Sequence, residues 1–243
     1  MQSPKVLIII PTYNERENIA SLIHAVFECV NVTILVVDDN SPDGTGTLVH
    51  DMARTDERLH ILHRPAKAGL GSAYREGFAW GLDHGFDYLI QMDADYSHEP
   101  RYISQFIQHM TGSDGVIGSR YVPGGRVVNW PLYRRLISIA GNWYEHLVLH
   151  MRDSRYMVLD STGGFNCWSA DLIRRIDITT IQSDGYCFQM ELKWRAIQED
   201  ALLREVPIRF TDRTRGKSKI SKSYAFEALA APFRLIKKEG NGA

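Results

Sequence analysis

Short apolar runs alternate with amphipathic stretches along the first half of the chain. Val6–Ile10 is apolar, mostly β-branched and closed by Pro11, which is typical of a buried strand. Asn18–Phe27 instead carries its apolar residues three and four positions apart, which is the spacing of one helix face. The same patterns predict further strands at Val32–Val37, Leu59–His63, Tyr88–Met92 and Gly115–Ser119. They also predict helices over Ser72–His84 and Pro100–Met110, and one that has Ser41 as its N-cap, Pro42 as its first residue and its end near Arg54.

The second half of the chain is less regular. Pro131–His150 and Gly185–Gln198 have helical patterns, whereas Leu203–Phe210 has the pattern of a single strand. Turn-forming residues fill Asp160–Phe165, and Asp212–Lys222 is a basic loop. Tyr224–Lys238 predicts an amphipathic helix that is interrupted at Pro232.

Strands that alternate with helices predict an α/β fold, with a mostly parallel sheet and helices on both faces. In such a sheet ligands bind beyond the carboxyl ends of the strands, and polar clusters follow Ile10, Val37, Met92 and Gly118. The length of 243 residues suits one large domain. We expect that domain at residues 1–222, followed by an amphipathic helix and tail at residues 223–243.

Composition narrows the class of protein without identifying it. Apolar residues make up 44% of the chain and charged residues 23%, values that are ordinary for a globular protein. The net charge of −1 does not support a nucleic-acid partner, so none is expected. The three cysteines are far apart and odd in number, which predicts no disulfide framework and a cytoplasmic location. No stretch reaches the roughly 18 apolar residues that a membrane span needs, and the first apolar run is too short for a signal peptide.

Asp93-Ala94-Asp95 is the sharpest chemical signal in the chain. Two carboxylates around one small residue, directly after a predicted buried strand, can bind a hard divalent cation. An ion at this point would neutralise charge that develops on a departing diphosphate. Because aspartate is also common in solvated turns, it is the position after a strand that favours metal binding.

The ends of the first two strands supply candidate nucleotide contacts. Asp39 could accept hydrogen bonds from a base or a ribose, although acidic residues also cap helix N-termini. Tyr13 could stack on a base while Glu15 contacts the nucleotide. A core tyrosine and a helix-capping glutamate are the alternative.

Basic residues supply candidate phosphate contacts. Arg120 follows the fifth predicted strand, and arginine suits bidentate phosphate binding, with a surface ion pair as the alternative. Arg213–Lys219 is a dense basic loop in a near-neutral chain. Its glycine and serine favour a lid that closes over a pyrophosphate, with anionic lipid headgroups and a solvated face as the other possibilities.

Together these motifs resemble glycosyltransferase family 2, and within it the dolichol-phosphate (polyprenol-phosphate) mannose synthases. The matching segments follow the family's order across roughly residues 4 to 222. They are Pro11–Glu15, Val37–Thr45, Lys67–Tyr74, Met92–Asp95, Gly118–Tyr121, Thr162–Phe165, Gly185–Glu191 and Val206–Lys219. The early segments are shared widely in the family, whereas Gly185–Glu191 and the basic loop are more specific to the mannose synthases. Many relatives carry C-terminal transmembrane helices, so the chain resembles the short form without them.

The resemblance implies a GT-A fold, GDP-mannose as donor, a polyprenyl phosphate as acceptor and Mg²⁺ or Mn²⁺ as cofactor. It implies nucleotide contacts from Pro11, Tyr13, Glu15, Val37 and Asp39. It places Asp93, Ala94 and Asp95 at the metal and the diphosphate, and Arg120, Arg213 and Lys219 at donor or acceptor phosphates. The expected metal ligands are Asp93 and Asp95, which form the catalytic set together with Arg120 and Arg213.

The acceptor would be a phosphate monoester whose oxygen is already ionised and nucleophilic at neutral pH, which favours a direct, inverting displacement. One alternative is a family-2 transferase that uses UDP-glucose or another nucleotide sugar with a lipid phosphate. The other is a non-catalytic nucleotide-sugar or lipid-binding protein. The presence of both aspartates and of the basic loop disfavours the second alternative.

A polyprenyl chain lies in a membrane, so we expect peripheral association with its cytoplasmic face, with or without a membrane-protein partner. One candidate surface is the C-terminal helix, through Tyr224, Phe226, Leu229, Phe233, Leu235 and Ile236. The other is Pro131–His150, through Trp130, Leu132, Leu136 and Ile137. For the C-terminal helix, packing on the domain is an equal alternative.

Overall fold

The computed structural model describes residues 3–181, 183–212 and 230–236. Its strands are β1 (Val6–Thr12), β2 (Thr33–Asp38), β3 (Leu59–His63), β4 (Tyr88–Gln91), β5 (Gly115–Ser119), β6 (Arg126–Val128), β7 (Asn166–Ser169), β8 (Leu203–Pro207) and β9 (Arg209–Thr211). Its helices are α1 (Arg16–Cys29), α2 (Thr45–Ala53), α3 (Leu70–Asp83), α4 (Tyr102–His109), α5 (Leu132–Arg152), α6 (Ala170–Ile176), the 3₁₀ helix η1 (Ile178–Thr180) and α7 (Gly185–Gln198). Residues 230–236 are also helical.

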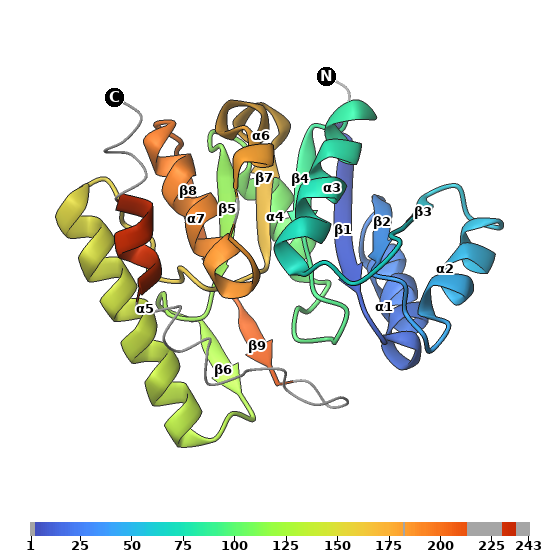
Figure 1. Ribbon diagram of the computed structural model, residues 1–243, viewed down its shortest axis with the longest axis horizontal. Helices are drawn as coiled ribbons and strands as arrows, with labels where there is room; N and C mark the ends of the chain where they lie inside the picture. Colours follow the sequence, from blue (N-terminus) through green and yellow to red (C-terminus); the bar gives the residue numbers. More distant parts are fainter. Residues whose placement is uncertain (1–2, 182, 213–229, 237–243) are drawn as a thin grey trace.

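A seven-stranded sheet in the order β3-β2-β1-β4-β7-β5-β8 runs through the molecule (Figure 1). Its neighbours pair in parallel except at β7, which is antiparallel to both β4 and β5. β6 and β9 pair in parallel as a separate two-stranded sheet. The expected α/β fold with a mostly parallel sheet is therefore confirmed.

The alternation of side chains along β1 divides the core into two layers. Leu7 and Ile9 face one side, where they join apolar side chains of α3, α6 and α7. Val6, Ile8 and Ile10 face the other side and join side chains of α1, α2 and α4. Because both faces of the sheet are covered, this central strand is apolar at consecutive positions, which is the pattern seen in the sequence.

The segment between β2 and α2 differs from its predicted form. The helix begins at Thr45 with Gly44 at the N-cap position, so the prediction that Ser41 caps it is wrong. The Ser41 hydroxyl donates instead to Asp38 Oδ1 at 2.6 Å, and the Ser41 N–H donates to Asp38 Oδ2 at 3.0 Å. Asp38 thus holds Ser41 in a turn, which delays the start of the helix.

The single strand predicted at Leu203–Phe210 is also wrong, because the segment forms two strands in different sheets. β8 pairs with β5, whereas β9 pairs with β6. Between them, the N–H of Ile208 donates to the Ser119 carbonyl and the Ile208 carbonyl accepts from the N–H of Arg126, both at 3.0 Å. Pro207 is tolerated in β8 because β8 is an edge strand and the ladder to β5 uses the N–H of the next residue, Ile208; the chain changes sheets after that bond.

Of the predicted C-terminal helix, the structure describes residues 230–236, which are helical through Pro232. The carbonyl with which the Pro232 ring would interfere lies four residues earlier, outside the described residues, so the expected interruption at Pro232 stays a prediction. Ala231 and Leu235 are each 6% exposed and belong to the core layer of α6 and α7. Tyr224, Phe226, Leu229 and the basic loop lie outside the described residues.

α5 turns a polar side toward the protein. Its buried residues are Asn142, Glu145 and Leu149, whereas large apolar side chains such as Ile137 and Trp143 are 68% and 66% exposed. In the part of the chain that the structure describes, no helix combines the length and the apolar character needed to cross a membrane.

Close packing between α3 and β1 gives a first test. A Cβ built on Gly77 would lie 2.4 Å from Cγ2 of the fully buried Ile9. We therefore expect Gly77→Ala to lower the free energy of unfolding by about 1–3 kcal/mol, the cost of overpacking. Gly141→Ala in α5 is the matched control, because nothing lies within 4 Å of its added Cβ; it should be neutral or stabilising by up to about 1 kcal/mol. Equal urea midpoints for the two variants would contradict this packing.

The buried Glu145 gives a second test. Glu145 is 4% exposed, and burial raises its pKa from 4.5 to about 7. Between those two values the folded protein holds a proton that the unfolded chain has lost, so this group makes stability fall as pH rises. Glu145→Gln should remove that fall, and its stability relative to the parent should grow by on the order of 2 kcal/mol from pH 4.5 to pH 7. Urea unfolding of both proteins across this range measures the difference, and a difference that does not change with pH would sink the idea.

Candidate functional site

A cavity of about 540 Å³ opens at the carboxyl ends of β1, β2 and β4. It is lined by Pro11, Thr12, Tyr13, Glu15, Asp39, Lys67, Gly69, Leu70, Ala73, Asp93, Ala94, Asp95, Thr162, Gly164, Asp184, Gly185, Tyr186 and Gln189. These residues end or follow three parallel strands, lie at or just before the starts of α3 and α7, or belong to the segment before β7. Because the ends of parallel strands meet at one edge of the sheet, segments far apart in sequence share this cavity.

Most of the predicted site residues that the structure describes line this cavity. They are Pro11, Tyr13, Glu15, Asp39, Asp93, Ala94 and Asp95. Val37 and Arg120 are not among the lining residues: the side chain of Val37 lies in the core at 0% exposure, and Arg120 is 7% exposed. Arg213 and Lys219 lie outside the described residues.

Asp39 is held at the end of β2 by a buried ion pair with Arg64. Arg64 also donates to Ser72 Oγ at 2.5 Å and to Glu76 Oε1 at 3.1 Å, both on α3. The second carboxylate oxygen of Asp39 accepts from the N–H of Ala68 at 3.3 Å. A buried charge needs such partners, and they fix the carboxylate at the cavity wall. Asp39 does not cap α2, whose N-cap position is Gly44.

Tyr13 and Glu15 lie beside Asp39 in the segment that follows β1. The Lys67 ammonium lies 4.1 Å from the centroid of the Tyr13 ring, a cation–π contact at the cavity surface. Glu15 stands at the N-cap position of α1 without a side-chain bond to the helix backbone, and its Oε2 accepts from Asn18 Nδ2 at 3.1 Å. Both side chains therefore belong to the cavity rather than to the core.

Asp93 and Asp95 stand in a turn whose shape depends on His98. The N–H of Asp93 donates to His98 Nδ1 at 3.0 Å, and the N–H of Ser97 donates to Asp95 Oδ1 at 3.1 Å. The His98 ring is 2% exposed and stacks on Phe165 with a centroid separation of 4.7 Å. Burial lowers the pKa of His98, so the ring is neutral at pH 7 and its Nδ1 can accept the backbone hydrogen bond.

The chemistry of these two carboxylates suits a hard divalent cation. Both line the cavity, and the Asp93 side chain is 37% exposed. Within residues 3–181, 183–212 and 230–236, no group of three or more His, Cys, Asp or Glu side chains is placed to hold a metal ion. An ion held by two carboxylates alone would take its other oxygen ligands from a donor diphosphate and water, which is common for Mg²⁺.

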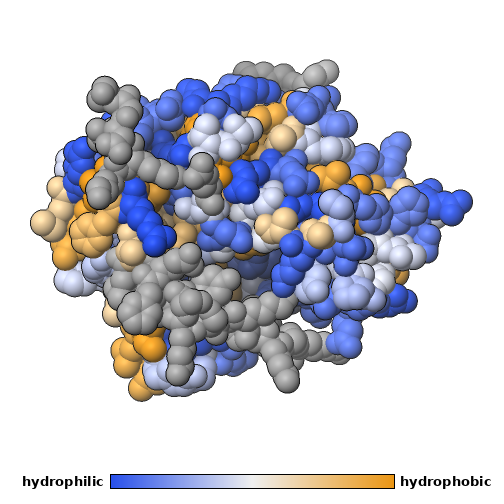
Figure 2. Space-filling view, viewed as in Figure 1, coloured by the Kyte–Doolittle hydropathy of each residue, from blue (hydrophilic) through white to orange (hydrophobic). Residues whose placement is uncertain are grey.

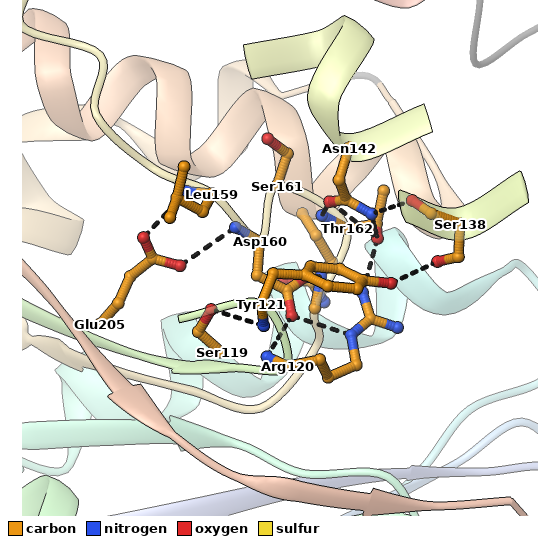
Figure 3. A network of polar contacts seen from close by, with 12 residues as sticks. Ser119, Arg120, Tyr121, Ser138, Asn142, Leu159, Asp160, Ser161, Thr162 and Glu205 are labelled. Atoms are coloured by element: carbon orange, nitrogen blue, oxygen red, sulfur yellow. Dashed lines mark hydrogen bonds and ion pairs between the residues drawn. The ribbon is translucent and has the colours of Figure 1, made fainter. Parts of the chain in front are cut away.

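Arg120 belongs to a buried network beside the cavity (Figure 3). Its Nε and Nη2 donate to the two carboxylate oxygens of Asp160 at 2.8 and 2.6 Å, and Nη2 also donates to Thr162 Oγ1 at 2.8 Å. The side chains of the pair are only 6% and 0% exposed, so the alternative of a surface ion pair is wrong. Burial alone would lower the pKa of Arg120, but the charge of Asp160 outweighs it and raises that pKa. Arg120 reaches the cavity wall through Thr162.

One wall of the cavity contains none of the predicted site residues. That wall contains Thr162, Gly164, Asp184, Gly185, Tyr186 and Gln189. The carboxylate of Asp184 accepts from the N–H of Gly71, which ties the start of α7 to the start of α3. The sequence does carry a signal for this wall, because Thr162–Phe165, Gly185–Glu191 and Lys67–Tyr74 are among the motifs that match the family.

Solved structures share this fold at low sequence identity. Glucosyl-3-phosphoglycerate synthase from Mycobacterium tuberculosis has a TM-score of 0.66 at 16% identity, covering 96% of this chain and 80% of that one. The same enzyme in complex with Mn²⁺, UDP and glucosyl-3-phosphoglycerate has a TM-score of 0.63 at 18% identity, with 96% and 77% covered. A mannosyltransferase from Pyrobaculum calidifontis in complex with GDP-Man and Mn²⁺ has a TM-score of 0.57 at 14% identity, with 100% and 77% covered. The fold is therefore GT-A-like, as expected.

Two curated proteins are far more similar to this chain in sequence than these solved structures are. The chain is 46% identical to the polyprenol monophosphomannose synthase of Mycolicibacterium smegmatis, over 93% of this chain and 84% of that protein. It is 43% identical to the undecaprenyl-phosphate mannosyltransferase of Micrococcus luteus, over 93% of this chain and 91% of that protein. The sequence profile of glycosyl transferase family 2 matches residues 7–181. The chain is thus a member of glycosyl transferase family 2.

Proposed function

We propose that this protein transfers mannose from GDP-mannose to a polyprenyl monophosphate and releases GDP. The main support is that one cavity contains all the groups this reaction needs. Asp93 and Asp95 line it together with Tyr13 and Asp39 toward one end, and with Thr162 and the start of α7 toward the other. Two relatives above 40% identity, named as a polyprenol monophosphomannose synthase and an undecaprenyl-phosphate mannosyltransferase, support the choice of sugar and acceptor.

The order of the strands suggests how the donor lies in the cavity. β2 and β1, which carry Asp39 and Tyr13, are followed by β4, which carries the aspartate pair, and then by β7. A nucleotide at Asp39 and Tyr13 would thus place its diphosphate at Asp93 and Asp95. The sugar would then lie toward Thr162 and the start of α7, where an acceptor can reach it.

The chemistry asks mainly for alignment. A phosphate monoester has a second pKa of about 6, so an acceptor oxygen is ionised at neutral pH and attacks the anomeric carbon as the bond from that carbon to GDP breaks, with inversion. A divalent ion such as Mg²⁺ or Mn²⁺, held by Asp93 and Asp95, would neutralise the charge of the leaving GDP. The residues of the chain hold this geometry: His98 orders the aspartate turn, and Arg64 fixes Asp39.

The acceptor resides in a membrane, and we place the contact with the cytoplasmic membrane surface on the outer face of α5. That face exposes Leu132, Tyr133, Leu136, Ile137, Trp143 and Met151 by 57–78% of their surface, and Figure 2 shows apolar atoms gathered along this side of the molecule. The helix also carries Arg134, Arg135 and Arg152, while its one acidic residue, Glu145, is buried. Arg134 pairs with Asp212 at 2.9 Å, so the exposed Arg135 and Arg152 are the arginines that would meet lipid. Aromatic and aliphatic side chains beside arginines suit an anionic lipid surface.

Transfer itself is the direct test of the proposed function. We expect radiolabelled mannose to pass from GDP-mannose to undecaprenyl phosphate with Mg²⁺ or Mn²⁺, and to stop when EDTA is added. Asp95→Asn should lower kcat/KM by ~100-fold or more, because it weakens the stabilisation of the leaving diphosphate. Asp51→Asn, at an exposed position on α2, is the matched control and should leave the rate unchanged. Transfer of glucose from UDP-glucose, with none of mannose from GDP-mannose, would show that the proposed donor is wrong. Tight binding of GDP-mannose without any turnover would favour a non-catalytic binding protein.

Vesicle binding tests the membrane surface without any sugar substrate. Ile137→Glu should weaken binding to phosphatidylglycerol-containing vesicles by ~10-fold or more, because it places a charge in the interface. Leu202→Glu is the matched control, since Leu202 is 56% exposed in the segment between α7 and β8 and should bind vesicles as the parent does. Co-sedimentation measures both, and equal binding by the two variants would remove α5 as the membrane surface.

A further inference from the structure

Lys193 of α7 is a buried cation that the proposed chemistry does not use. It is 0% exposed, and its Nζ donates to the carbonyl oxygens of Asp160, Ser161 and Gly163 at 2.9, 3.1 and 2.7 Å. An ammonium carries three N–H donors on one atom, so these bonds satisfy it completely. Although burial lowers the pKa of Lys193 to about 8, the group stays mainly charged at neutral pH.

The three carbonyls belong to one turn, residues 160–163, and this turn is held from the other side as well. The Asp160 carboxylate accepts from the backbone N–H of Arg120 at 2.8 Å and from the N–H of Gly163 at 2.9 Å, in addition to the Arg120 guanidinium. The carboxylate of Glu205 accepts from the N–H groups of Leu159 and Asp160 at 2.9 and 3.0 Å. Figure 3 shows these partners arranged around the turn.

This turn is part of the cavity. Thr162 and Gly164 line the wall, and Thr162 Oγ1 accepts from Arg120 Nη2. Thr162 also donates its N–H to Asn142 Oδ1 at 3.2 Å, which joins the wall to α5. The turn therefore sets the position of the wall, of Arg120 and of the inner side of α5 together.

No neutral side chain can replace the ammonium without loss. Three carbonyl oxygens converge on one point, and each would lose a charged donor if the cation were removed. The Gly163 carbonyl would keep the amide of Asn166, which donates to it at 3.0 Å, so the loss would fall mainly on the carbonyls of Asp160 and Ser161. Glutamine could supply two N–H donors from one atom, and methionine could fill the space but supply none. Arginine spreads its donors over a planar fork, so it does not reproduce the arrangement.

We propose that Lys193 is a positioning residue for the transfer reaction, because it fixes the turn 160–163 and thereby places Thr162 at the acceptor end of the cavity, with Arg120 behind it. The reaction that it affects rests on the proposed function, whereas its hold on the turn does not. Asp39, Tyr13 and Glu15 follow β2 and β1, whereas the turn precedes β7 on the far side of β4, so nucleotide binding and transfer should respond differently to the loss of the turn.

The test is a series that removes donors from position 193 one step at a time. Lys193→Gln and Lys193→Met are compared with the parent for transfer kinetics, for GDP-mannose affinity by calorimetry and for amide hydrogen exchange in residues 159–165. Arg195→Met is the matched control on the same helix, because Arg195 pairs with Glu191 at 2.8 Å and also contacts Thr180 rather than the turn.

We expect kcat/KM for the acceptor to fall by ~10-fold in Lys193→Gln and by ~100-fold in Lys193→Met, the cost of a small misplacement of reacting groups. The dissociation constant of GDP-mannose should change by less than about 3-fold, and exchange in residues 159–165 should rise in the same order. Arg195→Met should keep kcat/KM within about 2-fold, even if its melting temperature falls.

Several outcomes would overturn the proposal. Parental kinetics in a Lys193→Met protein that has only lost stability would make the residue merely structural. Unchanged exchange in residues 159–165 would show that Lys193 does not hold the turn. If Lys193→Met fails to fold, Lys193→Gln decides by the same two readouts. A parent that transfers no mannose contradicts the proposed function instead, and in that case hydrogen exchange alone decides whether Lys193 holds the turn.

Discussion

The parallel pairing of β2, β1 and β4 fixes the position of every strand end that faces the cavity. Thr12 at the end of β1 lies opposite Asp38 at the end of β2, and the N–H of Asp39 donates to the Thr12 carbonyl at 3.0 Å. On the other side, the N–H of Met92 donates to the Ile9 carbonyl at 3.1 Å. This register brings three strand ends to one edge of the sheet. Tyr13 and Asp39 therefore share a cavity with Asp93 and Asp95, although these residues are far apart in the sequence.

The opposite end of the cavity depends on buried charge rather than on strand register. β7 is antiparallel to its neighbours in the sheet. In the turn that precedes it, backbone carbonyls accept hydrogen bonds from Lys193, and the Asp160 carboxylate pairs with Arg120. Buried ionic groups contribute little net stability, yet each is costly to leave unpaired, so they specify one arrangement of the turn. A site that must align two anionic substrates has a use for such a rigid wall.

α5 reverses the usual arrangement of an amphipathic helix, since its polar side faces the protein and its apolar side faces outward. Asn142 on the inner side contacts Thr162 in the cavity wall, and Ser138 contacts Tyr121 next to Arg120 (Figure 3). The helix therefore joins a surface suited to lipid with the end of the cavity at which a lipid-borne acceptor would arrive. One element would then serve both membrane contact and acceptor alignment.

Local periodicity predicts the alternating strands and helices of the first half, the layered α/β fold and the position of Asp93 and Asp95 after a strand, because it reports which side chains are buried. The folded structure is needed to find the partners of buried charges: Arg120 pairs with Asp160, 40 positions away, and Lys193 donates to carbonyl groups that no side-chain pattern marks. It also divided Leu203–Phe210 between two sheets and placed the side chain of Val37 in the core instead of the cavity. The physical reason is that periodicity describes a segment's own backbone, whereas the partner of a hydrogen bond or an ion pair depends on which distant segment the fold brings beside it.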